Sequence, residues 1–356
     1  MFVTVAALCV FLGMKVRQVE RQRKAALWVN EMQGRVLYDY EVDDKGSMLL
    51  TGSAPPGPVW LRERTGVDFF ARIVSVELSP PEIAFHSHPR KQVHVSELSP
   101  LSALTSMKVL DASDTTVAAL SPLEKLTGLK RLYVGGTWVC DISPLAKLCS
   151  LTTLHLNDTP VTNISPLRGL AHVEELWLNG THVVDLSPLE HLEHLRMLEL
   201  SYTPVTDLAP LKRLAALEIL GMAGTKVTCV ASVGGLAQLK TLDLSENVVG
   251  DLTLLTALTK LECLDLDHTS TADLRPLINL KRLKTLYLAG TRVVDLSPLA
   301  HLTMLTDLDL SNTPVTDLSP LARMPSLRKL GLYGIQVRYD EVARLRKALP
   351  GCHITW

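Results

Sequence analysis

The chain has 356 residues, of which 47% are hydrophobic and 5% aromatic, and its formal net charge is −1. This length and apolar content support a large core and argue against a disordered chain. The balanced charge argues against a nucleic-acid partner, which selects for a basic surface.

The N-terminal segment, residues 1–14 (MFVTVAALCVFLGM), is almost wholly apolar. As a helix it extends about 21 Å, whereas the hydrocarbon core of a bilayer is about 30 Å thick. Basic residues follow directly: Lys15, Arg17, Arg21, Arg23 and Lys24. Such a cluster beside an apolar run is typical of the edge of a membrane anchor. We therefore expect a single-pass anchor that contacts the membrane; the alternative is a frayed apolar end of a soluble protein.

The position of the basic cluster also predicts an orientation. Because the cluster follows the apolar run, the charge rule places the rest of the chain in the cytoplasm, although basic residues upstream of Met1 would weaken this assignment. Residues 15–33 lack helix breakers and predict a basic juxtamembrane helix that ends at Gly34.

Residues 34–97 predict an N-terminal cap that contains a first, irregular repeat. Sequence pattern predicts strands at 36–42 and 73–78 and a short helix at 58–64. The loop at 79–92 is too long for the period that follows. Three histidines lie in or beside this loop: His86, His88 and His94. No cysteine or carboxylate cluster accompanies them, so we assign no metal and no cofactor.

Residues 98–337 repeat with a period of 22 residues. One series of positions holds threonine with a single exception: Thr115, Thr137, Thr159, Thr181, Thr203, Thr225, Asn247, Thr269, Thr291 and Thr313. Prolines keep the same period at Pro100, Pro122, Pro144, Pro166, Pro188, Pro210, Pro276, Pro298 and Pro320. A period of this size, with leucine at fixed offsets, indicates a leucine-rich repeat.

One repeat unit shows the physical basis of the pattern. Apolar and polar residues alternate in 132–134, as in a strand with one buried face. Apolar residues then recur every third position from Val139 to Leu154, which favours 3₁₀ turns over an α-helix. Ser143 and Pro144 suit the start of such a turn, because serine can cap free amides and proline fits a first helical position. A single unit cannot bury its leucines, so the units must stack side by side.

The pattern LxxLxLxxTxVxDLSPLxxL resembles the 22-residue repeats of bacterial internalin-like proteins over about two-thirds of the chain. The resemblance implies an α/β leucine-rich repeat solenoid, a curved right-handed superhelix with a parallel concave sheet and short 3₁₀ turns on its convex side. In-phase leucines from Leu110 to Leu330 predict eleven strands in the repeats. The chain departs from the family by placing Thr where Asn is usual, except at Asn247. A threonine hydroxyl can still bond nearby backbone, but with fewer donors than an amide.

The chain closes with a predicted C-terminal cap at 338–356, formed by a helix at 340–349 and a strand at 353–356. Caps at both ends are expected, because a solenoid must cover its terminal apolar faces. The cysteines are scattered along the repeat, and Cys140 and Cys229 are about four repeats apart, beyond disulfide reach. Free thiols favour a reducing compartment.

Two neighbouring repeats lack the Ser-Pro pair. Ala231-Ser232 and Thr253-Leu254 occupy its places, and Gly234 and Gly235 add backbone freedom to the first of them. We expect these two segments to be the least stable turns of the array.

The residues beside the first leucine of each strand should face solvent on the concave side. An N-terminal group, Tyr133, His155 and Trp177, predicts an aromatic ladder that could anchor a partner; the alternative is that these residues only favour strands. A later group is acidic, and Asp243 and Asp265 should be cross-strand neighbours whose repulsion a basic partner would relieve. The predicted partner-binding residues are Arg131, Tyr133, His155, Asn157, Glu175, Trp177, Asn179, Glu199, Asp243, Asp265, Asp267, Tyr287, Asp307 and Asp309.

These features predict a non-catalytic scaffold that binds a protein through the concave sheet. A regulatory subunit of an enzyme, such as a phosphatase, is the alternative. A metal-dependent hydrolase that uses the acidic patch is a distant third. No phosphate-binding glycine loop and no nucleophile–base pair can be assigned, so we do not expect an enzyme.

Overall fold

The computed structural model describes residues 2–42, 54–69, 71–79 and 94–356. The chain divides into two compact units, Met1–Val173 and Glu174–Trp356. Most of the predicted loop at 79–92, with His86 and His88, lies outside the described residues.

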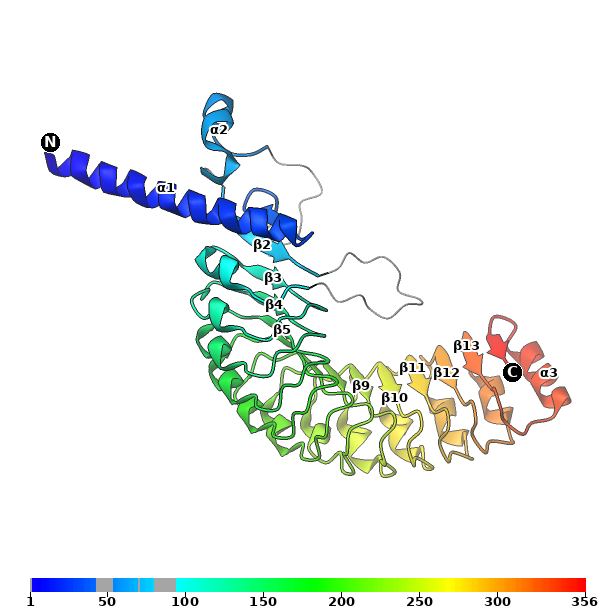
Figure 1. Ribbon diagram of the computed structural model, residues 1–356. Helices are drawn as coiled ribbons and strands as arrows, with labels where there is room; N and C mark the ends of the chain where they lie inside the picture. Colours follow the sequence, from blue (N-terminus) through cyan, green and yellow to red (C-terminus); the bar gives the residue numbers. More distant parts are fainter. Residues whose placement is uncertain (1, 43–53, 70, 80–93) are drawn as a thin grey trace. The chain divides into compact units, whose positions relative to one another are not determined.

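The first unit begins with an N-terminal helix and a pair of strands, and regular repeats follow them (Figure 1). Its elements are α1 (Phe2–Glu31), β1 (Arg35–Tyr38), α2 (Val59–Thr65), η1 (Val67–Phe69), β2 (Ile73–Glu77), η2 (Ser99–Ala103), β3 (Val109–Asp111), η3 (Ser121–Leu123), β4 (Arg131–Tyr133), η4 (Ser143–Lys147), β5 (Thr153–His155) and η5 (Ser165–Gly169). Strand β1 pairs antiparallel with β2, and β2 to β5 pair in parallel, each with the next. This unit therefore carries its cap, α1 and β1, at the β2 end.

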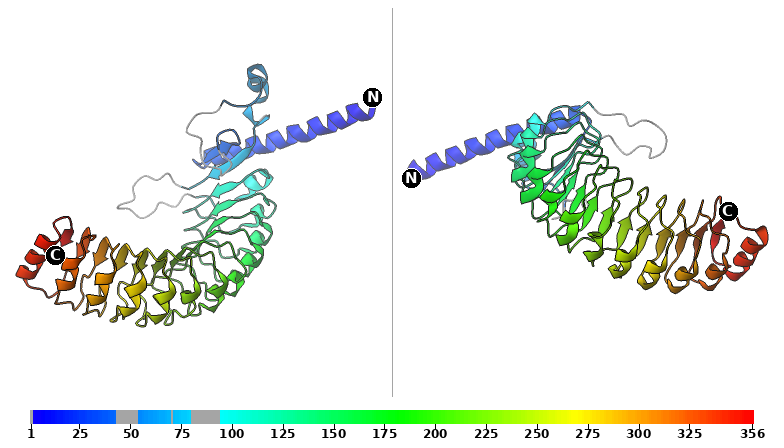
Figure 2. Two further views of the ribbon diagram at one scale, coloured as in Figure 1. Left: turned by 180° about the vertical axis from the view of Figure 1, so that it is seen from behind. Right: turned by 90° about the horizontal axis from the view of Figure 1, so that it is seen from below.

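The second unit is a longer stack of the same repeat, closed by an α-helix. Its elements are β6 (Glu175–Trp177), η6 (Ser187–Leu189), β7 (Met197–Glu199), η7 (Ala209–Arg213), β8 (Ile219–Gly221), η8 (Val233–Gly235), β9 (Thr241–Asp243), η9 (Thr253–Ala257), β10 (Cys263–Asp265), η10 (Arg275–Asn279), β11 (Thr285–Tyr287), η11 (Ser297–His301), β12 (Asp307–Asp309), η12 (Ser319–Arg323), β13 (Lys329–Gly331), α3 (Tyr339–Ala348) and β14 (His353–Thr355). All neighbouring strands from β6 to β14 pair in parallel. Within each unit the strands line one side and the 3₁₀ turns the other (Figure 2).

The core of each unit is a set of leucine rows that run across the repeats. Leu110, Leu132 and Leu154 are in register in the first unit, and all are fully buried. In the second unit the same row runs from Leu176 to Leu330 and ends at Ile354 in β14. The predicted solenoid of parallel strands with 3₁₀ turns is confirmed, and β3–β13 are the eleven predicted repeat strands.

The threonine series closes each repeat from the inside. Each hydroxyl is buried and donates to the carbonyl oxygen three residues earlier, at 2.5–3.1 Å. Asn247 does more, because its amide donates to the carbonyls of Met222 at 2.7 Å and Leu244 at 3.1 Å. Its oxygen also accepts from the Thr225 hydroxyl at 2.9 Å. The side chain thus bonds two adjacent repeats, a capacity that the single threonine hydroxyl lacks.

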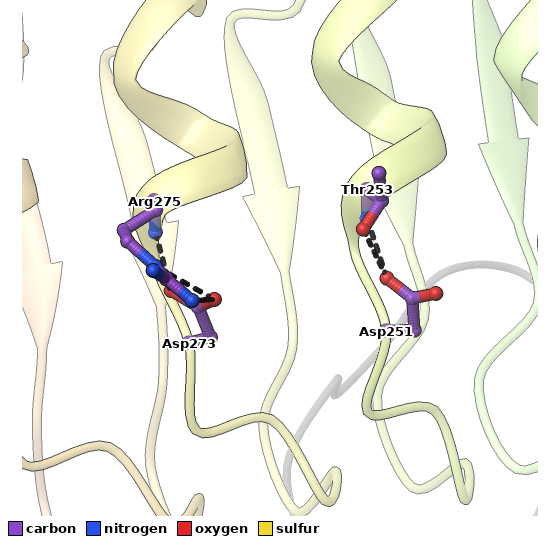
Figure 3. Close-up of polar contacts among 4 residues, drawn as sticks. All are labelled: Asp251, Thr253, Asp273 and Arg275. Carbon is purple, nitrogen blue, oxygen red and sulfur yellow. Dashed lines mark hydrogen bonds and ion pairs between the residues drawn. The ribbon is translucent and has the colours of Figure 1, made fainter.

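The 3₁₀ turns are capped by aspartate, and the predicted capping by serine is wrong. The Oδ1 atom of Asp141 accepts the backbone N–H of Ser143 at 2.8 Å, and the serine hydroxyl itself donates to Asp141. The same bond recurs before seven further turns, with Asp or Asn two residues earlier as acceptor: Asn163, Asp185, Asp207, Asp251, Asp273, Asp295 and Asp317. The turns η2, η3 and η8 have Glu97, Ala119 and Cys229 at this place. Figure 3 shows two of these caps, at Asp251 and Asp273. A carboxylate two residues earlier reaches the free amide in an Asx turn, whereas the serine is itself the first residue of the turn and its hydroxyl donates to the aspartate.

A second recurrent device was not predicted. The residue before each position of the threonine series, and Gly334 before Ile335 in the repeat that follows, has a left-handed backbone with φ of 54–73°. Glycine fills this position in five repeats and Asp, Asn, Glu, His or Tyr in the others. Asp and Asn tolerate this conformation better than most residues, and Tyr202, with φ of 59°, is the least expected occupant.

The N-terminal helix corrects the membrane prediction. Helix α1 is one continuous element of 30 residues that runs across the predicted boundary between residues 14 and 15. Among the described residues no helix is both long and apolar enough to cross a membrane. The predicted single-pass anchor is wrong, and with it the assignment of the repeats to the cytoplasmic side. The reason is that charged residues begin at Lys15, before the apolar run reaches the length a bilayer requires.

The second half of α1 instead packs on the rest of the first unit. Its inward residues, Val19, Gln22, Ala25 and Val29, are buried, with the spacing of one helix face. The buried Gln22 amide donates to the Ala71 carbonyl at 2.9 Å, and its oxygen accepts the Ile73 N–H at 3.3 Å. This side chain satisfies backbone groups at the start of β2, so it ties α1 to the cap.

Candidate functional site

The strand face of a unit is defined here as the solvent side of its strands. It carries the first and third residues of each strand, because the central leucine points into the core. The predicted partner-binding residues in strands occupy these positions, and Asn157, Asn179 and Asp267 follow two residues after β5, β6 and β10. Register places third residues of neighbouring strands side by side, for example Tyr133 with His155.

The strand face of the first unit is aromatic and uncharged at its centre. The rings of Tyr133 and His155 pack edge to face, with centroids 4.6 Å apart and planes at 77°. Burial lowers the pKa of His155 to about 4, although the charge of Asp111 opposes this shift. The imidazole is therefore neutral at pH 7. Arg131 is half-buried, and the Asn157 amide donates to Asp158 at 3.1 Å.

The strand face of the second unit begins with Trp177 in β6, in register with Glu199 in β7. Trp177 is half-buried and its ring nitrogen is inaccessible to solvent, as is the side-chain oxygen of Asn179. Glu175 is exposed. The predicted ladder of exposed aromatics thus differs in two respects: Tyr133, His155 and Trp177 are half-buried, and Trp177 belongs to the second unit.

Aspartates on the strand faces are partly engaged in local turns. Asp243 and Asp265 are neighbours in register, as predicted. The Oδ1 atom of each accepts the backbone N–H two residues later, at 2.9 Å. Asp111 and Asp309 make the same bond, at 2.9 and 2.8 Å. Part of the acidic character therefore stabilises the turns that leave the strands, and is not by itself a mark of a ligand.

Repulsion within this acidic group is nevertheless visible. Burial, followed by the charges of nearby carboxylates, raises the pKa of Asp265 to about 6 against one local hydrogen bond. Burial likewise raises the pKa of Asp267, whose Oδ1 accepts the Ala289 N–H at 2.6 Å. Asp307 differs, because Lys329 lies 3.1 Å from its Oδ1 atom and its pKa is lowered, first by the Thr306 hydroxyl.

Glu199 lies in a different environment from the aspartates. Its carboxylate leans over Gly221 in β8, in the space that a side chain there would fill. No described residue donates a hydrogen bond to it. Burial, and then the charge of Asp243, raise the pKa of Glu199 to about 7. The pKa of this carboxyl therefore lies near neutral pH, well above that of an exposed glutamate.

The described residues contain no group of three His, Cys, Asp or Glu side chains that could hold a metal ion. His94 is exposed, while His86 and His88 lie outside the described part of the chain. Two features of the site could have been found from sequence. The spacing Asp-x-Ser is an Asx-turn signal at strand ends and at 3₁₀ turns alike. Glycine at 221 and 331, within a row of large side chains, marks gaps in the strand face.

The repeat fold, together with the similarities to known proteins that follow, defines the class: the chain is a leucine-rich repeat protein. The family model for two copies of the leucine-rich repeat matches residues 149–191. Internalin InlF from Listeria monocytogenes has 25% sequence identity and a TM-score of 0.71, with 80% of this chain and 82% of that chain covered. Internalin C2 from the same species has 31% identity and a TM-score of 0.50, with 54% and 83% covered.

The fold also occurs in a plant receptor. The peptide hormone receptor RGFR1, solved in complex with RGF2, has 17% identity and a TM-score of 0.57, with 71% of this chain and 48% of that chain covered. No protein of curated function matches the chain. Leucine-rich repeat proteins generally act in protein–protein interaction and are typically non-catalytic scaffolds.

Proposed function

We propose that the protein is a non-catalytic scaffold that binds a protein partner through the strand faces of its repeats. In this proposal residues 98–337 supply the binding repeats, and residues 34–97 and 338–356 are the caps. The supporting observation is a contrast within the repeat. Positions that pack or cap hold the same residue types in nearly every repeat, whereas third strand positions differ from one repeat to the next.

The contrast is sharpest where local structure does not account for the side chain. Several strand-face aspartates cap turns, whereas among the described residues no hydrogen bond of this kind involves the side chains of Glu199 and Tyr287. Aromatic residues on a rigid sheet are preferred anchors in protein interfaces, because they bury a large area with little loss of side-chain entropy. A receptor with this fold that is seen in complex with a peptide hormone supports the choice of a protein ligand.

Site-specific photo-crosslinking in cells of the source organism tests this proposal. A benzoylphenylalanine replaces Tyr133 for the first unit, Tyr287 for the second, and the exposed Leu254 on the 3₁₀ side as the matched control. We expect discrete crosslinked species from positions 133 or 287 and none from 254. Crosslinks from the control alone, or from no position, would reject the proposal. If the captured partner is an enzyme, such as a phosphatase, a change in its activity on binding would indicate a regulatory subunit.

A further inference from the structure

A hollow of about 230 Å³ opens on the strand face of the second unit, above β11–β14. Gly331 in β13 has no side chain, and the carboxylate of its register neighbour Asp309 leans over it, with Thr355 on the other side. The other polar lining residues are Tyr287, Asp307, Lys329 and His353. Pockets for whole small molecules occupy roughly 300–1,000 Å³. The smaller hollow suits one inserted side chain.

The charges around the hollow favour a cation. Asp307 and Lys329 form an ion pair at 3.1 Å, so these two charges offset each other. The Oδ1 atom of Asp309 accepts a hydrogen bond from the Ser311 N–H at 2.8 Å, and within the described residues its Oδ2 atom has no partner. Asp265, one strand beyond Tyr287, adds a carboxylate whose raised pKa reflects burial and then neighbouring charges, including Asp309. A positive group placed here would relieve that repulsion.

The shape and chemistry of the walls favour a guanidinium over an ammonium. Tyr287 is 37% exposed, so its ring is available for the planar stacking that arginine makes. The Thr355 hydroxyl donates to the Leu330 carbonyl at 3.3 Å and keeps lone pairs to accept a bond. Two donors of one guanidinium could then bond Asp309 Oδ2 and Thr355 Oγ1. A lysine ammonium is a compact charge without the flat face that a ring stacks on.

We propose that this hollow, framed by Asp309, Tyr287 and Thr355 over Gly331, binds an arginine side chain of the protein partner. The inference rests on the proposed function, because the arginine arrives as part of a partner protein. It adds the chemistry of one contact: the second unit recognises a partner that presents an exposed arginine to β11–β14.

The test titrates the full chain with N-acetyl-arginine amide and follows the Gly331 amide and the Thr355 methyl by NMR. N-acetyl-citrulline amide is the neutral isostere, and N-acetyl-lysine amide carries the charge without the plane. We expect saturable shifts with the arginine probe. Affinity should fall by about tenfold with citrulline, since its urea lacks the positive charge and one of the nitrogen donors of the guanidinium.

Two variants localise the effect. Asp309→Asn keeps an oxygen for the Ser311 N–H but removes the charge, and it should weaken the arginine probe by about tenfold. Asp243→Asn is the matched control, because it caps Ser245 in the same way but does not line the hollow. Equal effects of the two variants, or equal binding of arginine and citrulline, would overturn the inference.

The result is separable from that of the crosslinking experiment. A partner that crosslinks to position 287 and binds Asp309→Asn as tightly as the parent protein would leave the proposed function intact and reject the arginine contact. Specific probe binding without any crosslinked partner would reject the proposed function, while the hollow would remain an arginine-selective site.

Discussion

Two neighbouring turns of the second unit differ in a way that shows what a turn requires. Both lack the Ser-Pro pair, with Ala231-Ser232 in one and Thr253-Leu254 in the other. The second still has an Asp cap, because Asp251 accepts the Thr253 N–H at 2.9 Å, and η9 is five residues long (Figure 3). The first has Cys229 in place of the aspartate, and η8 is three residues long and begins only at Val233.

The difference shows that an aspartate cap can accompany a five-residue 3₁₀ turn where Ser-Pro is absent. A sequence-based expectation that both turns are weak is thus revised: we expect fast hydrogen exchange at η8 and ordinary exchange at η9. The physical reason is that a free amide at the start of a helical turn needs an acceptor, which Asp supplies and a cysteine thiol, a weak acceptor, does not.

The largest expected effect on stability concerns a feature that both turns share, a buried apolar side chain: Val233 in η8 and Leu255 in η9. Leu255 is fully buried in η9, so Leu255→Ala should lower the free energy of unfolding by about 2–5 kcal/mol through lost burial and a cavity. Leu254→Ala, at an exposed neighbour, should change it by less than about 0.5 kcal/mol. Urea unfolding of both variants measures this, and similar losses would show that the faces are assigned wrongly.

Removing the cap should make the stronger turn resemble the weaker one. Asp251→Ala deletes the acceptor for the Thr253 N–H and should cost about 1 kcal/mol. Hydrogen exchange of residues 253–257 should rise towards that of η8. Asp251→Asn retains an acceptor oxygen and serves as the control. If exchange in η9 stays unchanged in Asp251→Ala, the cap does not account for the difference between the turns.

Adding the cap should strengthen the weaker turn. Cys229→Asp places a carboxylate two residues before Ala231, as Asp207 lies two before Ala209, whose N–H it accepts at 2.8 Å. We expect a gain of roughly 0.5–1 kcal/mol and slower exchange in 231–235, measured by mass spectrometry. Cys229→Ser removes the thiol without reaching as far and should give little gain. An equal gain from serine would point to the loss of cysteine as the cause.

The smallest expected effect on stability comes from the strand face, where two carboxylates differ in the same way as the two turns. Asp243 accepts a backbone N–H, whereas Glu199 accepts none from the described residues. The folded pKa of Glu199, about 7, lies above the ordinary pKa of a glutamate, 4.5. Folding therefore favours the protonated form, and stability is lost as pH rises from 4.5 to about 7. Glu199→Gln should raise the melting temperature at pH 8 but hardly at pH 5, with Glu193→Gln as the surface control. An equal rise at both pH values would contradict the shifted pKa.

Much of the fold could be read from the spacing of residues. The 22-residue period and the interval of three between apolar positions predict the strands and 3₁₀ turns, because these patterns reflect backbone geometry directly. The predicted neighbours Asp243 and Asp265 are likewise a consequence of a fixed repeat length. The predicted membrane anchor is wrong because the charged residues from Lys15 onward continue the same helix and leave its apolar part too short to span a bilayer.

Sequence by itself determined which residues lie in each strand, which leucines are buried and which residue types recur on the strand face. Only the tertiary structure decided how those face residues are used: that Asp309 caps a turn with one oxygen, that Glu199 leans over Gly221 and Asp309 over Gly331, and that a hollow opens beside Asp309. The physical reason is the range of the interactions. Core periodicity arises within one repeat, whereas a side chain's burial, pKa and partners depend on atoms that lie one or two repeats away and meet it only when the units stack.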